Sequence, residues 1–393
     1  MLSCLLVFSC TGLAKPADET TGEASGQSQG LPGTDSGAGI NYDVLGGMKF
    51  IISAVPQLVT PPGIGEITKD QRDPVNALSG TEKTNLSARF KDAYIDALLL
   101  DLPINGVLGG DFVHGWPANS PGTWIQNWRS SENFSNSWGI PSLILATYSV
   151  SQERVFIVSG GIMDTYGKSA GVNHANGVKG YGSPRTDEFV YQGMRAQRFD
   201  LGLIRQNEKG TLEFIQEDPP TAQLEAPPMT GELRNAPGDE QAKIKQIFLK
   251  GWSLAVDRNM PPLIPDRPVA AYDLTAAPWT YQGQIALPFQ VHKIYIQSFN
   301  NETLALVYID SPSLPAVPRI IESPFLEILA SASTGRIPGS PEFLTDKIKP
   351  EADDAFTNSL LLGFDTYGIP LTDTVLKNDK ISQRFTFGWM EAE

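Results

Sequence analysis

The chain has 393 residues, of which 41% are hydrophobic, so it is long and apolar enough to bury a sizeable core. Its formal net charge is −14 at pH 7, and an acidic surface repels phosphate backbones, which argues against nucleic-acid binding. Its two cysteines, Cys4 and Cys10, lie at the N-terminus. The body beyond them is therefore expected to hold neither a disulfide nor a thiolate metal site.

Residues 1–10 have the character of an export signal. Met1 to Phe8 is almost wholly apolar, and Val7-Phe8-Ser9-Cys10 resembles the lipobox of bacterial lipoproteins. The resemblance implies that Cys10 carries a lipid and becomes the mature N-terminus. Since no other run approaches the ~20 apolar residues of a membrane helix, we expect an exported protein that is anchored at the cell envelope or surface through its N-terminal lipid only.

Residues 11–42 are predicted to form a disordered tether. They are Gly, Ser, Thr, Ala and acidic residues for the most part, and such a segment cannot bury enough apolar surface to offset the entropy of ordering. Regular structure is expected to begin near the strand-like run Met48–Ile52. An acidic, Pro-rich loop at 217–239 is predicted to separate an N-terminal half (43–216) from a C-terminal half (240–393).

Helical and strand-like patterns alternate through both halves, which predicts an α+β fold. Leu86, Phe90 and Tyr94 share one face of a helix over 86–102, which Pro103 ends. Further helices are expected at Glu240–Leu249, after Ser323-Pro324, and around Ala352, Phe356 and Leu360; strands are expected at Arg154–Ser159, Ile294–Phe299, Thr303–Tyr308 and Ile381–Phe387.

The strongest signal is an internal repeat. Tyr-Gly-x-Pro-x-Thr-Asp begins at Tyr181 and again at Tyr367, and Gln-Arg-Phe and a glycine follow at the same offsets in both copies. The matched residues are Gly182, Pro184, Thr186, Asp187, Gln197, Phe199 and Gly202 in one copy, and Gly368, Pro370, Thr372, Asp373, Gln383, Phe385 and Gly388 in the other. Weaker copies are Ile125-Gln126-Asn127-Trp128, Ile296-Gln297-Ser298-Phe299 and the turn Trp138-Gly139-Ile140-Pro141.

Each repeated residue type has a structural role. Gly-x-Pro predicts a tight turn after a helix, because proline fixes φ. The Thr-Asp pair can bond nearby backbone amides. Gln and Phe lie two residues apart on a strand, so they share one face. We expect Phe to enter the core and the Gln amide to bond backbone groups of the next unit.

This order of motifs resembles the LGFP repeats of bacterial cell-surface proteins. In those, a helix precedes a Gly-(Tyr/Phe)-Pro-(Thr/Ser)-x-Glu turn and a Gln-x-Phe-x-x-Gly hairpin; Glu188 also falls in the matching turn. The resemblance implies repeat-built units of one helix and a short antiparallel hairpin, which can close into a propeller-like ring, and association with wall polysaccharide. The spacing here is irregular and carries long insertions, so the resemblance implies no particular ligand.

No histidine or glycine pattern predicts a metal or cofactor site. The three histidines, His114, His174 and His292, are widely separated. Gly167–Gly171 fits Gly-x-Ser-x-Gly with Ser169 at its centre, but a Gly- and Asn-rich segment follows where a nucleophile elbow needs a helix. A glycan-cleaving pair remains open if carboxylates converge in space. The carboxylates considered are Asp111, Asp164, Asp187 and Glu188.

The sequence offers more residues suited to a binding site than to a catalytic site. Four tryptophans lie close together in sequence, with asparagines among them: Trp116, Trp124, Trp128 and Trp138. Sugars stack on aromatic rings and bond to amides, so this stretch is a candidate glycan site; the alternative is that the rings fill a core.

Three functions are compatible with these patterns. The first is non-enzymatic binding of envelope polysaccharide or a surface protein. The second is a secreted hydrolase acting on glycan or ester substrates, and the third is a scaffold without a ligand. Convergence of carboxylates, or of Ser169 with a histidine, in one pocket would favour the hydrolase.

Overall fold

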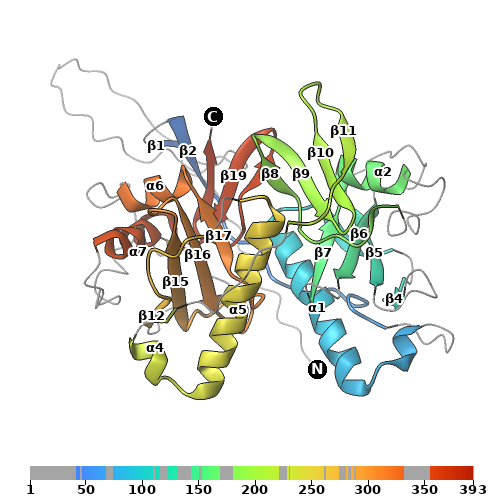
Figure 1. The fold of residues 1–393 in the computed structure, drawn as a ribbon, viewed down its shortest axis with the longest axis horizontal. Helices are drawn as coiled ribbons and strands as arrows, with labels where there is room; N and C mark the ends of the chain where they lie inside the picture. The colour runs from blue at the N-terminus through green and yellow to red at the C-terminus, as the bar shows by residue number, and fades with distance from the viewer. Residues whose placement is uncertain are drawn as a thin grey trace, which may run out of the picture. The chain divides into compact units, whose positions relative to one another are not determined.

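A computed structural model describes most of the chain from residue 41 onward. The described residues are 41–44, 47–67, 74–108, 111–115, 123–130, 143–149, 153–168, 180–220, 228–229, 231–260, 263–273, 280–281, 285–286, 289–331 and 355–392. Gly39–Glu393 forms one compact unit. Helix makes up 30% and strand 36%, which confirms the α+β prediction (Figure 1). The sequence-based candidates outside the described residues are Cys10, residues 11–40 of the tether, Trp116, Trp138, Ser169 and His174.

Two helices of 20 residues each dominate the helical part, α1 (Gly80–Leu99) and α5 (Gly238–Asp257). α1 begins at a capping box, in which Ser79 Oγ accepts from Glu82 N and Glu82 Oε2 accepts from Ser79 N, at 3.3 and 2.7 Å. α5 extends the predicted helix at both ends. The shorter helices are a 3-10 helix (Pro74–Ala77), α2 (Gly160–Lys168), α4 (Gly231–Asn235), α6 (Phe325–Ser331) and α7 (Ala355–Tyr367).

Two sequence-based expectations about helices are refined. The segment 217–239, predicted as a loop, contains α4 and the first residues of α5. Ser323-Pro324 does precede a short helix, α6, and the Ser323 hydroxyl bonds the Glu327 carboxylate. None of the helices among the described residues combines the length and apolar character needed to cross a membrane.

The strands form four main antiparallel sheets and one small hairpin. In spatial order, the first sheet is β3 (Ile104–Val107), β5 (Trp124–Ser130), β6 (Leu143–Ser149) and β7 (Arg154–Val158), with β4 (His114–Gly115) beside β5. The second is β11 (Leu212–Gln216), β10 (Gly202–Gln206), β9 (Met194–Phe199) and β8 (Phe189–Tyr191).

The remaining sheets are built in the same antiparallel manner. The third is β12 (Ala270–Asp273), β15 (Lys293–Phe299), β16 (Leu304–Asp310) and β17 (Arg319–Glu322). The fourth is β1 (Asn41–Val44), β2 (Met48–Ile52), β20 (Gly388–Ala392), β19 (Lys380–Phe385) and β18 (Val375–Lys377). The hairpin is β13 (Thr280–Tyr281) and β14 (Ile285–Ala286). The predicted repeat hairpins, β9–β10 and β19–β20, are thus parts of larger sheets, and the described strands close into no barrel or propeller.

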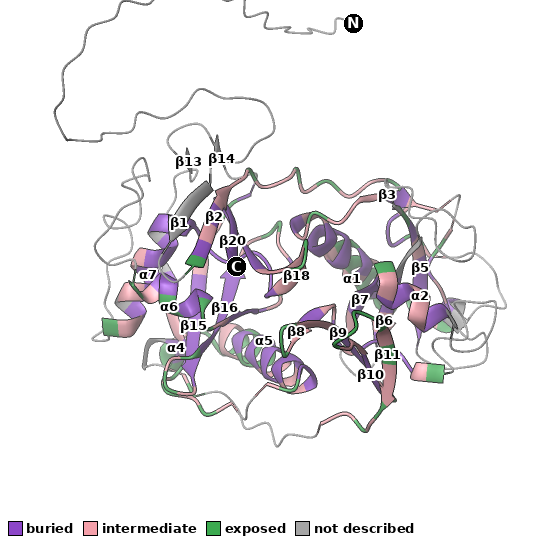
Figure 2. Ribbon diagram, turned by 90° about the horizontal axis from the view of Figure 1, so that it is seen from above, coloured by how far each residue is buried: buried purple, intermediate pink, exposed green. Residues whose placement is uncertain are grey.

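The fourth sheet joins distant parts of the chain. β2 pairs with β20 in a register that places Phe50 opposite Met390. Residues 41–52, which include β1 and β2, therefore share a sheet with the C-terminal strands β18, β19 and β20, although the sequence placed 43–52 in the N-terminal half. In Figure 2 β20 is mostly purple, since four of its five residues are buried.

Both long helices pack on a sheet through apolar side chains. α1 contacts β6 and β7, where Phe90 and Tyr94 meet Trp128 and Val155. α5 contacts β16 and β17 in the same manner, and its apolar side chains meet Phe299, Leu306 and Ile320. Each half thus sets a helix against a four-stranded sheet, and the functional candidates lie where these helix–sheet pairs approach each other.

Candidate functional site

The repeated turns need glycine at their second position. Gly182 has φ +82° and Gly368 has φ +89°, both in the left-handed region that favours glycine. A Cβ at Gly182 would lie 2.5 Å from Asp200 Cβ, and one at Gly368 would lie 2.0 Å from Thr386 Oγ1. In the same turns, Pro184 bridges to Phe199 and Pro370 to Phe385.

The glutamine of each copy ties the turn to a neighbouring sheet. Gln197 Nε2 donates to Thr186 O at 2.8 Å and to Ile157 O, on β7, at 2.9 Å. In the second copy the corresponding residues are Gln383, Thr372 and Ile320, with both distances 2.9 Å. Both glutamines are fully buried, as are Phe199 and Phe385. Phe199 and Phe385 thus lie in the core and both glutamines bond backbone carbonyls; the carbonyls outside the turns, Ile157 O and Ile320 O, precede the glutamines in the chain.

The two weaker copies make a related contact. Gln126 Nε2 donates to Gly63 O at 2.8 Å, and Gln126 Oε1 accepts from Gly65 N at 3.0 Å. Gln297 Nε2 donates to Arg267 O at 3.3 Å. In each of the four main sheets, one buried glutamine therefore bonds the backbone of a segment outside its own strand.

The aspartates of the repeat bind both backbone and arginine. Asp187 Oδ1 accepts from Ile157 N at 2.9 Å, and its Oδ2 accepts from Arg154 at 3.0 Å. Asp373 Oδ1 accepts from Ile320 N at 2.7 Å, and its Oδ2 accepts from Arg258 at 2.7 Å. The prediction that the Thr-Asp pair bonds backbone amides holds in both copies, since Thr186 and Thr372 also accept from Arg198 N and Arg384 N.

Around these aspartates lies a charge cluster of three acids and three bases, and its net charge is zero when all are ionised. Its members are Asp96, Asp187, Asp373, Arg154, Arg258 and Arg319. Asp96, on α1, accepts from Arg154 at 3.3 Å and from Arg319 at 2.5 Å. Because these residues come from α1, β7, β17, the end of α5 and both turns, the cluster joins the two halves.

The carboxylates of the charge cluster respond differently to burial. Burial is the largest influence on Asp187 and raises its pKa, although Arg154 opposes the shift. Burial also disfavours the charged form of Asp373, but Arg258 and the other arginines outweigh it and lower the pKa. Asp373 is thus held as a carboxylate by its arginines, as expected of an ion-paired structural acid.

A small cavity lies against the charge cluster. Arg258 lines it, and its Nε and Nη1 are buried without a hydrogen-bond partner among the residues that the structure describes. Glu188 lines it as well; burial raises the pKa of Glu188 to about 7, while its salt bridge to Arg195 at 3.0 Å works in the other direction. Asp187 and Glu188 are therefore two sequence-predicted carboxylates that line a common cavity.

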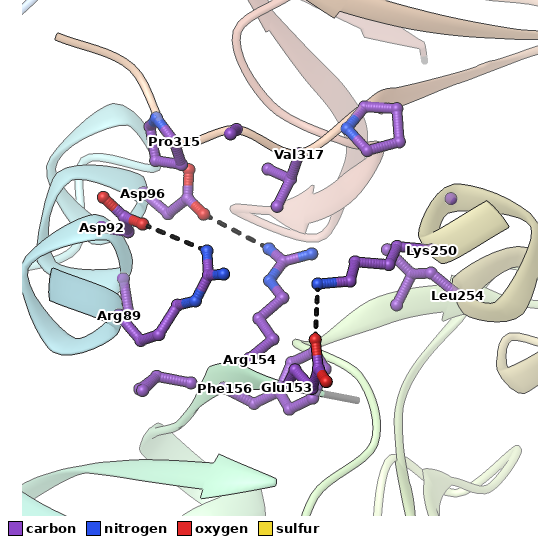
Figure 3. Close-up of a pocket in the computed structure, with 15 residues that line it drawn as sticks. Arg89, Asp92, Asp96, Glu153, Arg154, Phe156, Lys250, Leu254, Pro315 and Val317 are labelled. Atoms are coloured by element: carbon purple, nitrogen blue, oxygen red, sulfur yellow. Dashed lines mark hydrogen bonds and ion pairs between the residues drawn. The ribbon is translucent and has the colours of Figure 1, made fainter. Parts of the chain in front are cut away.

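A second, larger recess adjoins the cluster and shares Asp96 and Arg154 with it. We call this the interhalf recess. It is formed by α1, the start of β7, α5 and residues 315–318 (Figure 3). Its charged residues are Arg89, Asp92, Asp96, Glu153, Arg154 and Lys250, and its apolar wall includes Phe156, Leu254, Pro315 and Val317.

Two of the acids in the interhalf recess are paired at its rim. Lys250 Nζ lies 3.0 Å from Glu153 Oε2, and Arg89 Nη1 lies 3.8 Å from Asp92 Oδ2. Burial, followed by the nearby charge of Asp96, raises the pKa of Asp92 to about 6. The recess therefore becomes more positive as the pH falls through 6.

Of the four tryptophans of the candidate glycan site, the two that the structure describes, Trp124 and Trp128, do not form an open aromatic platform. Trp128 is fully buried, its Nε1 donates to Gln126 Oε1 at 3.1 Å, and its ring meets Tyr94 edge-on at 5.3 Å. Trp124 is partly buried against Tyr148, with ring centroids 5.4 Å apart. Both rings contribute to the core beside the first sheet. For these two tryptophans, the structure therefore agrees with the alternative left open by the sequence, that the rings fill a core.

The other candidates from the sequence lie apart. Asp111 bonds Asn127 and contacts His114 Nδ1 at 3.5 Å, whereas Asp164 lies on α2. α2 ends at Lys168, so a helix leads to Ser169 where a nucleophile elbow needs a strand. Within the described ranges no three His, Cys, Asp or Glu side chains are grouped to hold a metal ion.

Sequence reasoning missed the arginines. Arg154 and Arg319 each begin the last strand of a four-stranded sheet, β7 or β17, and each contacts Asp96. The sequence did offer one signal for these arginines: two strand-like runs, Arg-Val-Phe-Ile and Arg-Ile-Ile-Glu, both begin with arginine. Neither a protein-family model nor a curated protein matches this chain.

Proposed function

We propose that this chain is an exported lipoprotein, lipidated at Cys10, whose repeat-built body binds an envelope polysaccharide or a surface partner without altering it chemically. The observation that carries the proposal is the charge cluster. Asp96, Asp187 and Asp373 are each bonded to arginine, and the two turn aspartates are also bonded to a backbone N–H. Acids engaged in this way hold the fold together and are poorly placed to exchange protons with a substrate.

The proposal of a repeat-built body is supported by the four buried glutamines. Gln126, Gln197, Gln297 and Gln383 each donate to the carbonyl of a loop or turn outside their own strand. Chance placement of four buried amides in one role is a poor explanation. We infer that they descend from one unit related to the LGFP type, enlarged here by extra strands.

Binding and cleavage are separated by one experiment. The purified full chain is sedimented with insoluble envelope polysaccharide, and the supernatant is assayed for new reducing ends and released ester acids. We expect the protein to co-sediment and the supernatant to stay free of products. Release of sugar or acid that grows with protein concentration and with time would overturn the non-enzymatic proposal. If the protein neither co-sediments nor releases products, a scaffold without a ligand is favoured.

The anchor is tested separately from the ligand. In a bacterial host fed labelled palmitate, wild type is expected to carry label and to fractionate with membranes, whereas Cys10→Ala is expected to lose both. Cys4→Ala is the matched control, because it removes the other cysteine of the signal. Equal labelling of wild type and Cys10→Ala would exclude Cys10 as the lipidated residue.

A hydrolase remains a second candidate because of one observation, the pKa of about 7 at Glu188 in a cavity beside Asp187. A protonated carboxylic acid near a carboxylate is the arrangement of a glycosidase. Glu188→Gln removes the acid but keeps its shape. If the full chain releases sugar, loss of that release in Glu188→Gln with an unchanged melting temperature would establish this candidate.

A further inference from the structure

We propose that the interhalf recess binds the oxyanion of an acidic sugar, a carboxylate or phosphate group, through Arg154, Arg89 and Lys250. The inference rests on the proposed polysaccharide-binding function and names the chemical group that the body would recognise. Figure 3 shows the three cationic side chains entering the recess from α1, β7 and α5.

Arg154 supplies the fixed element of this site. Its Nη2 is engaged by Asp96 and Asp187, which hold the guanidinium in place, and 15% of the side chain remains exposed. Its Nε and Nη1 have no protein acceptor among the described residues. The N–H groups of Nε and Nη1 lie in the plane of the fixed guanidinium fork, so they can donate to the oxygens of a carboxylate or phosphate.

Arg89 and Lys250 supply the adjustable elements. Their side chains are 38% and 36% exposed, and each has one acidic partner at the rim, Asp92 or Glu153. An incoming oxyanion can replace these partners, because Glu153 is 66% exposed to water and Asp92, with its pKa raised to about 6, can take up a proton once it is displaced. Exchange of one exposed ion pair for another costs little.

The apolar wall accounts for the sugar. Ala316 and Val317 are the apolar lining residues with exposed surface, whereas Phe156, Leu254 and Pro315 line the recess as buried side chains. A sugar ring presents C–H faces that pack on such surfaces while its acidic substituent reaches the cations. A recess that joins a guanidinium fork to an apolar wall thus fits an acidic saccharide better than a neutral one.

Asp92 adds a pH dependence. The charged groups around it are Arg89 and Asp96 on α1, Arg154 on β7, Arg319 on β17, and Glu153 and Lys250 at the rim. Since protonation of Asp92 removes a negative charge beside Arg89, a uronate, which stays ionised throughout, is expected to bind more tightly at pH 5.5 than at pH 7.5. A sugar phosphate loses part of its own charge below about pH 6, which opposes this effect. Asp92→Asn mimics that protonation, so it should bind more tightly at pH 7.5 and lose most of the pH dependence.

The test is isothermal titration calorimetry on the full chain with D-glucuronate, glucose 6-phosphate and glucose. We expect either or both acidic sugars to bind at least about tenfold more tightly than glucose, and the tighter of the two identifies the oxyanion. Arg89→Ala and Lys250→Ala should each weaken acidic-sugar binding about fivefold or more, the loss of one charge-assisted hydrogen bond. Lys91→Ala and Lys245→Ala, exposed on the same two helices, should not.

Two results would overturn the inference. One is equal binding of glucose and both acidic sugars; the other is acidic-sugar binding unchanged in Arg89→Ala and Lys250→Ala. If the wild type still co-sediments with envelope polysaccharide in either case, the proposed function stands and only the recess is wrong. If co-sedimentation is absent as well, both proposals fail.

Discussion

Gln197 and Gln383 show how single side chains specify this fold at the residue scale. Each is fully buried and donates its two N–H groups to backbone carbonyls of two different segments. Buried carbonyls left without a donor cost about 1–3 kcal/mol each. One amide therefore decides where a turn lies on the neighbouring sheet.

Removal of either glutamine side chain should destabilise the fold. Gln197→Ala and Gln383→Ala should each lower the free energy of unfolding by about 2–4 kcal/mol, because two carbonyls lose their donor. Chemical denaturation measures the change. Gln216→Ala, exposed on β11, is the control and should stay within about 0.5 kcal/mol of wild type. Losses as small as the control's in the two buried variants would contradict the assigned role.

At the scale of elements, two arginines hold the C-terminal ends of the long helices. Arg198, on β9, donates to Asp257 O, at the last residue of α5, at 3.1 Å. It also donates to Asn259 Oδ1, just beyond α5, at 2.8 Å. Arg384, on β19, donates to Asp101 Oδ1 beyond α1 at 2.6 Å and to Ala54 O at 2.6 Å. Each sheet arginine thus fixes the helix of the other half, which explains why the two halves form one compact unit.

We therefore expect Arg384→Met to lower the free energy of unfolding by about 1–3 kcal/mol, chiefly because Ala54 O loses its donor, while Asp101 is 40% exposed and keeps Lys377 as a partner. The side chain is 1% exposed, so methionine keeps its packing volume and removes only the charge and donors. Arg205→Met, a control at 33% exposure on β10, should change stability by less than about 1 kcal/mol. Thermal unfolding in which both variants melt like wild type would refute the coupling.

For the whole molecule, local patterns in the sequence predicted the elements but not their assembly. Apolar spacing located α1, and the repeat located the β9–β10 and β19–β20 hairpins and the buried Gln and Phe residues. The pairing of β2 with β20 and the meeting of Asp96 with Arg319 join residues over 200 positions apart. Nothing in local periodicity specifies such contacts, so the charge cluster and the interhalf recess could not be foreseen.

Stability of the whole molecule should depend on pH through its buried acids. Burial raises the pKa of Glu188 and of Glu322 to about 7 from the ordinary 4.5. Between those values the folded form binds more protons than the unfolded form, so the free energy of unfolding falls as the pH rises from 4.5 through 7. Asp373, whose pKa is lowered, works in the opposite sense and loses its contribution as the pH falls below about 3.8.

We accordingly expect maximal stability near pH 5 and a loss on the order of 1–3 kcal/mol by pH 8. Urea denaturation across this range measures it. The double variant Glu188→Gln with Glu322→Gln should make the fall above pH 5 shallower, with Asp92 contributing what remains, whereas Glu208→Gln, on the exposed turn after β10, should leave the profile as in wild type. A profile that rises from pH 5 to pH 8 would show that these acids ionise normally.

We propose that this body binds an acidic envelope saccharide without altering it chemically. The most direct measurement is a glycan array probed with the full chain, in which matched neutral, uronate-containing and phosphorylated oligosaccharides are compared, with the Arg89→Ala, Lys250→Ala double variant alongside. We expect signal on the acidic glycans, weaker signal on their neutral counterparts, and loss of the acidic preference in the double variant. Absence of signal on every glycan, or an equal pattern for wild type and the double variant, would contradict it.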